Sequence, residues 1–134
     1  MAKRPRHTLS LTKKSNKYNN SRVFRYDRWF DSEHEADRFT ELFMLQKSGK
    51  ITGLRTQVPF ELIPTQRDPD VIGPRGGVKP GRCIEKSCVY YADFVYKDSS
   101  GNVVVEDAKG VRTEAYRIKK KLMLYVHKIR IIEV

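Results

Sequence analysis

Charged side chains end one apolar stretch of this chain and interrupt another. The stretch VVVEDAKG, residues 103–110, follows three valines with acids and a lysine, among them Asp107 and Lys109. The stretch VYYADFVY, residues 89–96, contains Asp93 as its single acid. A carboxylate on a buried strand is costly unless a cation pairs with it. These residue types therefore indicate either a cation site or a buried ion pair between Lys109 and one of the aspartates.

The spacing of these residues assigns them to faces of a sheet. Successive side chains of a strand alternate between its two faces, so Asp107 and Lys109 share one face and Glu106 lies on the other. The turn residues at 99–102 predict a hairpin between the two stretches, which brings Asp93 near Asp107. A β-bulge would exchange Glu106 for Asp107 at the site, and face alternation favours Asp107.

Two aspartates on adjacent strands suit a hard divalent cation. Mg²⁺ is usually held by one or two carboxylates, with its other positions left to water and substrate phosphate. Such a cation stabilises the charge that develops on a scissile phosphate and activates water for attack. Lys109 beside them would neutralise charge in the transition state or assist deprotonation. The chemistry expected is phosphodiester hydrolysis with Mg²⁺ or Mn²⁺.

A helix is predicted at residues 32–48, because Ser32 followed by Glu35 matches a capping box and Gly49 provides a stop. Glu35 also falls on the apolar stripe of this helix, where it either supplies a third carboxylate or completes the capping box; the two roles can coexist. The apolar residues of the stripe are Ala36, Phe39, Leu42 and Phe43.

The remaining patterns complete a mixed α/β (α+β) fold of order αβββαβ. Pro59 indicates that the strand at residues 53–64 is an edge strand or contains a bulge. The other expected elements are a strand or hairpin at 22–30, a long loop or hairpin tip at 65–82, a strand at 83–96, a helix from Thr113 to about 126, and a short closing strand. The inward face of that second helix is expected to be Ala115, Ile118, Leu122 and Tyr125.

The charge is concentrated at one end of the chain. The formal net charge is +11, and residues 1–28 hold nine Lys and Arg residues against Asp27 alone. A basic segment with few apolar residues is typical of a flexible arm attracted to polyanions, so we expect residues 1–28 to be an arm, residues 29–134 to be the folded domain, and nucleic acid to be the partner. The alternative is a solubilising tail, which charge alone does not distinguish.

Several classes of protein are disfavoured by composition. The chain has no apolar run of the length of a membrane span and no secretory signal pattern, so a cytoplasmic location is expected. Cys83 and Cys88 are too few for a disulfide framework, and their spacing is not that of a zinc half-site. The histidines are scattered, which argues against a histidine metal centre.

Taken together, these motifs resemble the PD-(D/E)XK nuclease superfamily, in which an acid on one strand precedes D-x-K or E-x-K on the next. The stretches FDSEHEADRF, QVPFELIP, YYADFVY and VVVEDAKG more closely resemble a phage and prophage family of small proteins of unknown function, similar to Holliday junction resolvases. The resemblance covers residues 28–134. It implies a restriction-endonuclease-like core with a mixed central sheet flanked by helices.

The resemblance also implies roles for particular residues. Asp93, Asp107 and Glu35 would be metal ligands, Lys109 the catalytic lysine, and Gln57 a contact to the metal water or phosphate. The chain departs from the family pattern because Ala92, not proline, precedes the first acid and because the second acid is aspartate, not glutamate.

The expected activity is that of a Mg²⁺-dependent endonuclease acting on branched DNA in phage recombination or replication, as a homodimer. The alternatives are a non-catalytic nucleic-acid-binding or regulatory protein on the same fold, and a nickase or end-processing nuclease. Phosphate contacts without sequence readout are expected from basic residues outside the acidic site. These residues are Lys3, Arg4, Arg6, Lys13, Lys14, Lys17, Arg75, Lys79, Lys119 and Lys120.

Overall fold

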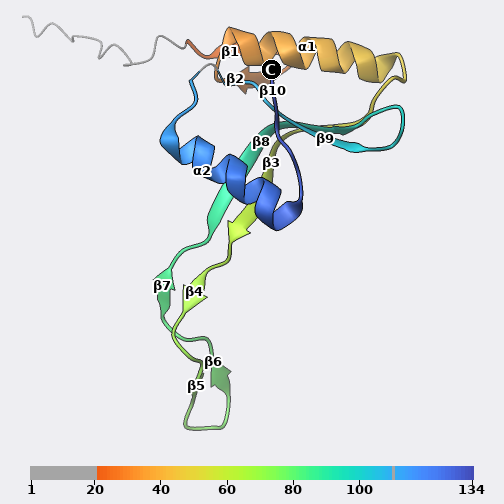
Figure 1. Cartoon of the computed structure of the whole chain (residues 1–134). Helices are drawn as coiled ribbons and strands as arrows, with labels where there is room; N and C mark the ends of the chain where they lie inside the picture. The colour runs from red at the N-terminus through yellow and green to blue at the C-terminus, as the bar shows by residue number, and fades with distance from the viewer. Residues whose placement is uncertain (1–20, 110) are drawn as a thin grey trace, which may run out of the picture.

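The structure is a computed structural model that describes residues 21–109 and 111–134 (Figure 1). Its elements, in chain order, are β1 (Val23–Arg25), β2 (Arg28–Phe30), α1 (Glu33–Lys47), β3 (Thr52–Ile63), β4 (Gln66–Arg67), β5 (Val71–Ile72), β6 (Val78–Lys79), β7 (Cys83–Glu85), β8 (Cys88–Lys97), β9 (Val103–Asp107), α2 (Glu114–Leu122), the π-helical segment η1 (Met123–His127) and β10 (Ile132–Glu133).

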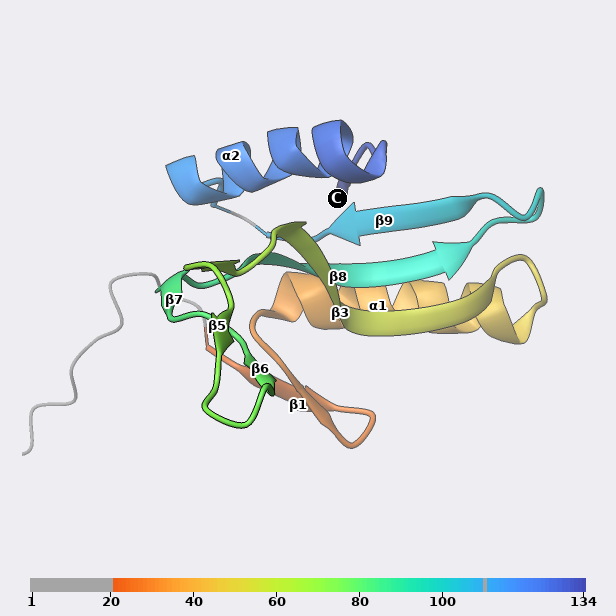
Figure 2. The same ribbon diagram turned by 90° about the horizontal axis from the view of Figure 1, so that it is seen from below.

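A mixed four-stranded sheet forms the centre of the fold. Its strand order is β10-β9-β8-β3; the pairs β3–β8 and β8–β9 are antiparallel, and β10 runs parallel to β9. The helix α1 lies on one face and α2 on the other (Figures 1 and 2). The expected mixed sheet flanked by helices is confirmed. Pro59 lies in β3, which is an edge strand of this sheet, as a proline in a ladder requires.

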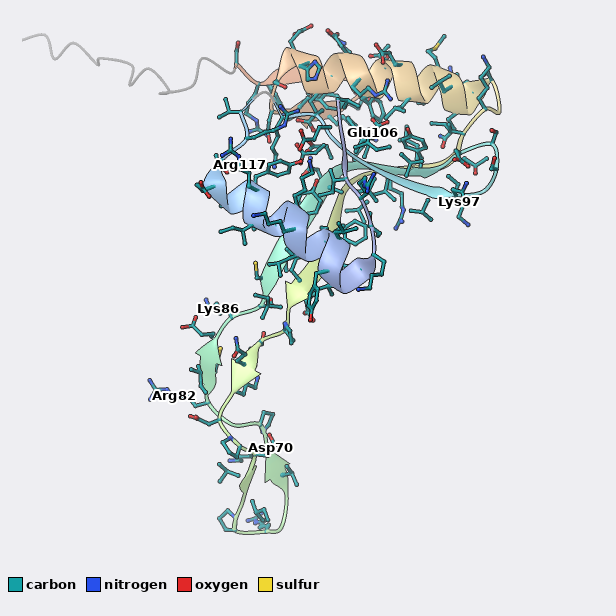
Figure 3. All side chains as sticks on the ribbon, in the orientation of Figure 1. Asp70, Arg82, Lys86, Lys97, Glu106 and Arg117 are labelled. Atoms are coloured by element: carbon teal, nitrogen blue, oxygen red, sulfur yellow. The ribbon has the colours of Figure 1, made fainter. Side chains whose placement is uncertain are left out.

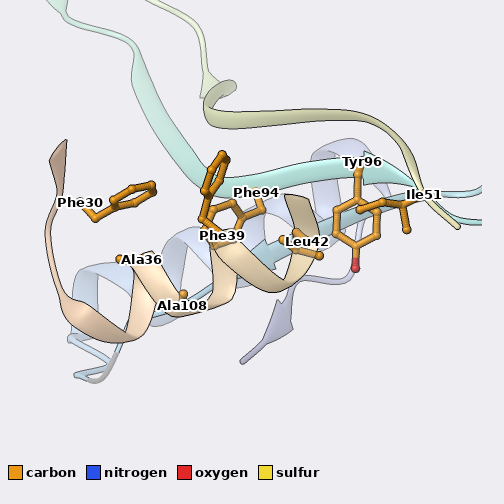
Figure 4. Packing of buried hydrophobic residues seen from close by; sticks show 8 residues of the cluster. All are labelled: Phe30, Ala36, Phe39, Leu42, Ile51, Phe94, Tyr96 and Ala108. Carbon is orange, nitrogen blue, oxygen red and sulfur yellow. The ribbon is translucent and has the colours of Figure 1, made fainter. Parts of the chain in front are cut away.

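The helix α1 forms where capping and periodicity predict it. The Ser32 hydroxyl accepts a hydrogen bond from the Glu35 backbone N–H at 3.1 Å, which satisfies one free donor of the first turn. Its apolar stripe packs on one face of β8 and against the segment after β9. The hydrophobic core cluster formed by this packing consists of Phe30, Ala36, Phe39, Leu42, Ile51, Phe94, Tyr96 and Ala108 (Figure 4).

The second helix buries only part of the face expected. Thr113 caps it, accepting from the Tyr116 N–H at 3.2 Å. Leu122 packs against the core as predicted, whereas Ala115, Ile118 and Tyr125 are exposed, so the predicted inward face was wrong at those three positions. Tyr116 and Met123 are buried in their place, because Tyr116 packs against Tyr90 of the sheet and the π-helical turn after Leu122 shifts the register.

An extended arm, comprising residues 64–87, projects away from the sheet (Figure 1). The pairs β4–β7 and β5–β6 form its two short ladders, so the long basic segment is a hairpin tip and not an irregular loop. The single strand expected at residues 83–96 is instead divided into β7 and β8. A β-carbon at Gly81 would lie 1.8 Å from the Asp68 carbonyl oxygen, so the two sides of the arm approach at a distance that only glycine permits.

The N-terminal hairpin β1–β2 belongs to the folded part of the chain. Arg25 reaches α1, where its guanidinium donates to Glu33 at 2.6 Å and to Asp37 at 2.8 Å. The predicted arm at residues 1–28 therefore overlaps an ordered hairpin at its C-terminal end. No helix among residues 21–109 and 111–134 has the length and apolar character needed to cross a membrane.

Candidate active site

The two aspartates lie side by side at the end of the β8–β9 ladder. The last paired residues are Phe94 and Glu106, so Asp93 and Asp107 occupy the next position along the two strands. Each aspartate is only 3% exposed. The predicted hairpin thus brings the two acids together, and the rigid strands fix their positions.

Each carboxylate is held by donors from the surrounding strands. Asp93 accepts from the Ala108 N–H at 2.8 Å and from the Gln57 amide at 3.0 Å. Asp107 accepts from the Tyr90 hydroxyl at 2.8 Å and from the Lys109 N–H at 3.1 Å. Each carboxylate oxygen receives one of these four bonds and keeps a second acceptor position. The four bonds orient both side chains and leave room for a further ligand.

The electrostatics of the pair favour a cation. Burial raises the pKa of Asp93, and the negative charge of Asp107 raises it further, while the hydrogen bond from Ala108 opposes the shift. Burial and the charge of Asp107 also raise the pKa of the Tyr90 hydroxyl, which therefore stays protonated and donates. The ammonium of Lys109 lies 4.0 Å from Asp107 and is half exposed. One lysine at this distance offsets part of the charge of two buried carboxylates.

Gln57 joins Glu35 to this pair. Its amide nitrogen lies 3.0 Å from Asp93 and 3.2 Å from Glu35, so one NH₂ group contacts both acids. Gln57 has φ of 51° in the middle of β3, a left-handed conformation that is rare for a non-glycine residue and that clusters at functional sites. The irregularity in β3 turns this side chain toward Asp93.

Glu35 connects the start of α1 with the aspartate pair. Its carboxylate accepts from the Asp31 N–H at 3.3 Å, close to the helix start, and from Gln57 on its other oxygen. Burial, followed by the charge of Asp93, raises the pKa of Glu35 to about 7. It reaches the aspartate pair through Gln57, not by a direct contact, and it can exchange a proton near neutral pH.

Glu106 is occupied on the opposite face of the sheet. It accepts from Arg38 at 2.9 and 2.7 Å and from the Tyr96 hydroxyl at 2.5 Å, and it is 1% exposed. No bulge moves it to the face of Asp107, because the β8–β9 register is regular up to that residue. Face alternation therefore separates the two adjacent acids as predicted.

The donor set fits a magnesium-type cation held by two carboxylates. Asp93 and Asp107 are buried oxygen donors with open acceptor positions and incomplete charge compensation, which are the properties of a site for a hard cation. Within residues 21–109 and 111–134, no group of three or more His, Cys, Asp or Glu side chains has the arrangement of a metal-binding cluster. Glu35 is thus separated from the aspartates by Gln57, and the three-acid ligand set is not assembled in this conformation.

A pocket of about 460 Å³ opens beside Glu35 and Gln57, and neither Asp93 nor Asp107 lines it. Glu35 and Gln57 line it together with the hairpin residues Arg28 and Trp29. The sequence reasoning did not include these hairpin residues or Tyr90 in the site. The signal available for Tyr90 was its position in the same apolar stretch as Asp93.

The expected phosphate-binding residues fall on separate surfaces. Arg75 lies at the tip of the arm and Lys79 in β6, and Figure 3 shows Arg82 and Lys86 projecting from the same arm. Lys120 forms an ion pair with Glu133 at 2.6 Å, and Lys119 is half-buried. The structure brings none of these into the acid cluster. The remaining six residues, Lys3, Arg4, Arg6, Lys13, Lys14 and Lys17, lie outside the described residues.

The side of α2 that borders the C-terminal segment carries further cations. A pocket of about 650 Å³ lies along this helix and the C-terminal segment. Its basic lining residues are Arg112, Arg117, Lys120, Lys121 and Arg130. Arg112 and Lys120 are both paired with Glu133. The other three basic residues of this pocket, Arg117, Lys121 and Arg130, have no ion pair within the described residues.

The fold and site define a small mixed α/β domain with two buried aspartates and a lysine at the end of a central hairpin. The chain belongs to the family DUF1064, described as a protein of unknown function, which it matches over residues 15–132. Searches of the curated proteins and of the solved structures gave no match.

Proposed function

We propose that this protein is a metal-dependent DNA endonuclease of the PD-(D/E)XK type. The observation that carries the proposal is the pair of buried aspartates, Asp93 and Asp107, on adjacent strands with the ammonium of Lys109 at 4.0 Å. Two buried like charges with one partly exposed lysine are a poor arrangement for stability. They are a good arrangement for holding a divalent cation beside a phosphate.

Asp93 and Asp107 would hold Mg²⁺ or Mn²⁺. When bound, the cation supplies charge stabilisation at the scissile phosphate and lowers the pKa of a water molecule. Tyr90 and the backbone N–H groups of Ala108 and Lys109 fix the carboxylates, so no reorganisation is needed during the reaction. The Lys109 side chain is exposed enough to reach a phosphate oxygen or the attacking water.

Gln57 and Glu35 would support the aspartate pair from β3 and α1 without holding the cation. Gln57 orients Asp93, and its amide lies where a phosphate or water contact is also possible. Glu35 shares the Gln57 donor and titrates near neutral pH, so it can take up or release a proton next to the site.

The basic surfaces would bind DNA phosphates without reading sequence. The arm and the exposed cations of α2 lie outside the acid cluster, so their contribution is electrostatic and falls steeply with salt. The basic residues of the N-terminal segment would add to this electrostatic contribution. The preferred substrate is branched DNA such as a Holliday junction, cut by a homodimer with two active sites. Phage recombination or replication in the host cytoplasm is the corresponding role.

The test compares a supercoiled plasmid with a four-way junction in Mg²⁺, Mn²⁺ and EDTA. Wild-type protein should cleave only with the metal, and Asp107→Ala and Asp93→Ala should not cleave. Glu61→Ala is the matched control, because Glu61 is an exposed acid of β3 whose side chain has no hydrogen bond or ion pair within the described residues. Binding without cleavage under every condition would overturn the proposal and leave a non-catalytic DNA-binding role. Preferred cutting of nicked or linear DNA would indicate a nickase or end-processing nuclease.

A further inference from the structure

The hairpin β1–β2 exposes a pair of aromatic rings to solvent. Phe24 and Trp29 are directly opposite each other in the ladder, so they project from the same face. Their ring centroids are 5.2 Å apart at an interplanar angle of 54°, and they are 57% and 59% exposed. These two side chains are not part of the hydrophobic core. The ring of Tyr26, by contrast, contacts Phe39 and Phe43.

The surrounding contacts make this hairpin a rigid support. Arg25 is bonded to two acids of α1, and Arg28 donates to the Thr56 hydroxyl of β3 at 3.1 Å. The guanidinium of Arg28 also lies over the Phe39 ring, 4.7 Å from its centroid. The hairpin turn holds Tyr26 and Asp27 at φ of 56° each, a conformation that non-glycine residues adopt at a cost. The aromatic pair is therefore presented in a fixed orientation.

Trp29 connects the aromatic pair with a pocket next to the candidate active site. Trp29 lines the same pocket of about 460 Å³ as Glu35 and Gln57, the two residues that connect with Asp93. The side chain of Arg22 lies 5.5 Å from the centre of the Trp29 ring, so a cation stands next to the exposed indole. Aromatic rings combined with cations on a groove next to a phosphate site form a recognition surface for a nucleotide strand.

We propose that Trp29, supported by Phe24, stacks on an unpaired nucleobase of the DNA strand held at the acid site, with Arg22 contacting the adjacent phosphate. The faces of paired bases are covered by their neighbours in a duplex, so a rigid aromatic ring stacks on a base only where pairing or stacking is interrupted. The substrate class is thus DNA with an unpaired base close to the scissile phosphate. The position relative to cleavage rests on the proposed endonuclease function, but the stacking does not require cleavage.

Stacking is measured in EDTA, where cleavage is absent by design. Trp29 is the single tryptophan of the chain, so its fluorescence reports this contact without a label. The probes are a single-stranded thymidine 12-mer, a 12-mer of abasic sugar phosphates with the same charge, and a 12-base-pair duplex. The thymidine strand should quench the tryptophan emission, and the abasic strand and the duplex should not. Equal quenching by all three probes would overturn the proposal.

Affinity for the labelled thymidine strand tests the same contact by substitution. Trp29→Ala should weaken binding about tenfold, the size expected for loss of one base–aromatic stack, and Trp29→Phe should weaken it less. Tyr125→Ala is the control, because Tyr125 is an exposed aromatic residue on η1. Thermal melting confirms that each variant is folded. Unchanged affinity in Trp29→Ala would refute the stacking role.

The two proposals fail in different ways. If Trp29→Ala loses affinity for the thymidine strand while the wild-type protein cleaves nothing, the aromatic site stands and the endonuclease does not. If the wild-type protein cleaves junctions with metal and Trp29→Ala binds and cleaves as well as wild type, the endonuclease stands and the aromatic site is refuted.

Discussion

Substitution of Glu106 should mainly lower stability, and substitution of the adjacent Asp107 should mainly lower activity. The two acids differ by one position in the strand, yet Glu106 pairs with Arg38 on the α1 face while Asp107 faces Asp93 across the ladder. The substitutions Glu106→Gln and Asp107→Asn are matched, because each replaces a buried carboxylate with an amide of the same shape. Each removes one negative charge. Any difference between them reports the environment of the side chain.

The structure gives the size of the expected stability effect. Removing one partner of a buried ion pair typically costs 3–5 kcal/mol. Arg38 keeps its contact with Glu41 at 2.6 Å, and its side chain is 25% exposed, so Glu106→Gln should cost about 3 kcal/mol, near the lower limit. For a domain of this length, that corresponds to a fall in melting temperature of about 10 °C.

Asp107→Asn should behave in the opposite way. It removes one of two repelling buried carboxylates and keeps an oxygen that can accept from Tyr90 or from the Lys109 N–H. The other donor loses its acceptor, which typically costs about 1–3 kcal/mol, and the lost repulsion between the carboxylates offsets part of this cost. The free energy of unfolding should therefore fall by less than about 2 kcal/mol. Metal-dependent cleavage should fall by at least about 100-fold. Glu106→Gln should cleave within about threefold of wild type at a temperature where it is folded.

The measurements are urea unfolding in EDTA and initial cleavage rates at 25 °C for the three proteins. The reasoning is refuted if Asp107→Asn is destabilised as much as Glu106→Gln, or if folded Glu106→Gln loses cleavage while Asp107→Asn keeps it. The stability comparison remains informative even if no substrate is cleaved, because it depends only on the Arg38 pair.

Three further results are expected. Because burial raises the pKa of Glu35 from 4.5 to about 7, the folded protein binds this proton more tightly than the unfolded chain. In EDTA, the stabilisation that protonated Glu35 contributes should be fully present below pH 4.5 and lost as the pH rises through 7. Glu35→Gln should flatten the dependence of the free energy of unfolding on pH, measured by urea unfolding. An unchanged pH dependence would contradict the assignment. Lys109→Met should lower the cleavage rate by about 100-fold or more while DNA affinity changes little; a loss confined to affinity would assign Lys109 to binding alone. Gly81→Ala should make the arm more susceptible to limited proteolysis without lowering the melting temperature of the sheet, because its β-carbon would clash with the Asp68 carbonyl; an unchanged cleavage pattern would show that the arm tolerates the clash.

The parts of this protein that its sequence determines are those controlled by neighbours along the chain. Ser32 caps α1 because its hydroxyl is next to the free N–H groups of the first turn, and the stripe of α1 follows from helical periodicity. The alternation of β9 likewise places Glu106 and Asp107 on opposite faces. The turn at residues 99–102 then brings Asp93 beside Asp107. Local geometry is enough for each of these results.

Other features depend on partners far away in the sequence. Arg38 neutralises Glu106, which is 68 positions away in the sequence. No pattern in the sequence around Arg38 or around Glu106 predicts that these two residues pair. Gln57 reaches Asp93 because β3 takes a left-handed conformation there, which the sequence does not signal. The buried face of α2 was predicted correctly only at Leu122, because the packing of Tyr116 on Tyr90 and the π-helical turn after Leu122 depend on the rest of the domain.

In the hairpin β1–β2, too, the local sequence determines the element and distant contacts determine its position. Its sequence suggested a short strand or hairpin, and its arginines were counted with a basic arm. The fold decides that Arg25 and Arg28 anchor the hairpin on α1 and β3, and that Trp29 borders the pocket beside Glu35. Periodicity and capping act over a few residues, so they determine the elements. The contacts between elements depend on packing of the whole domain, so only the tertiary structure assembles the site.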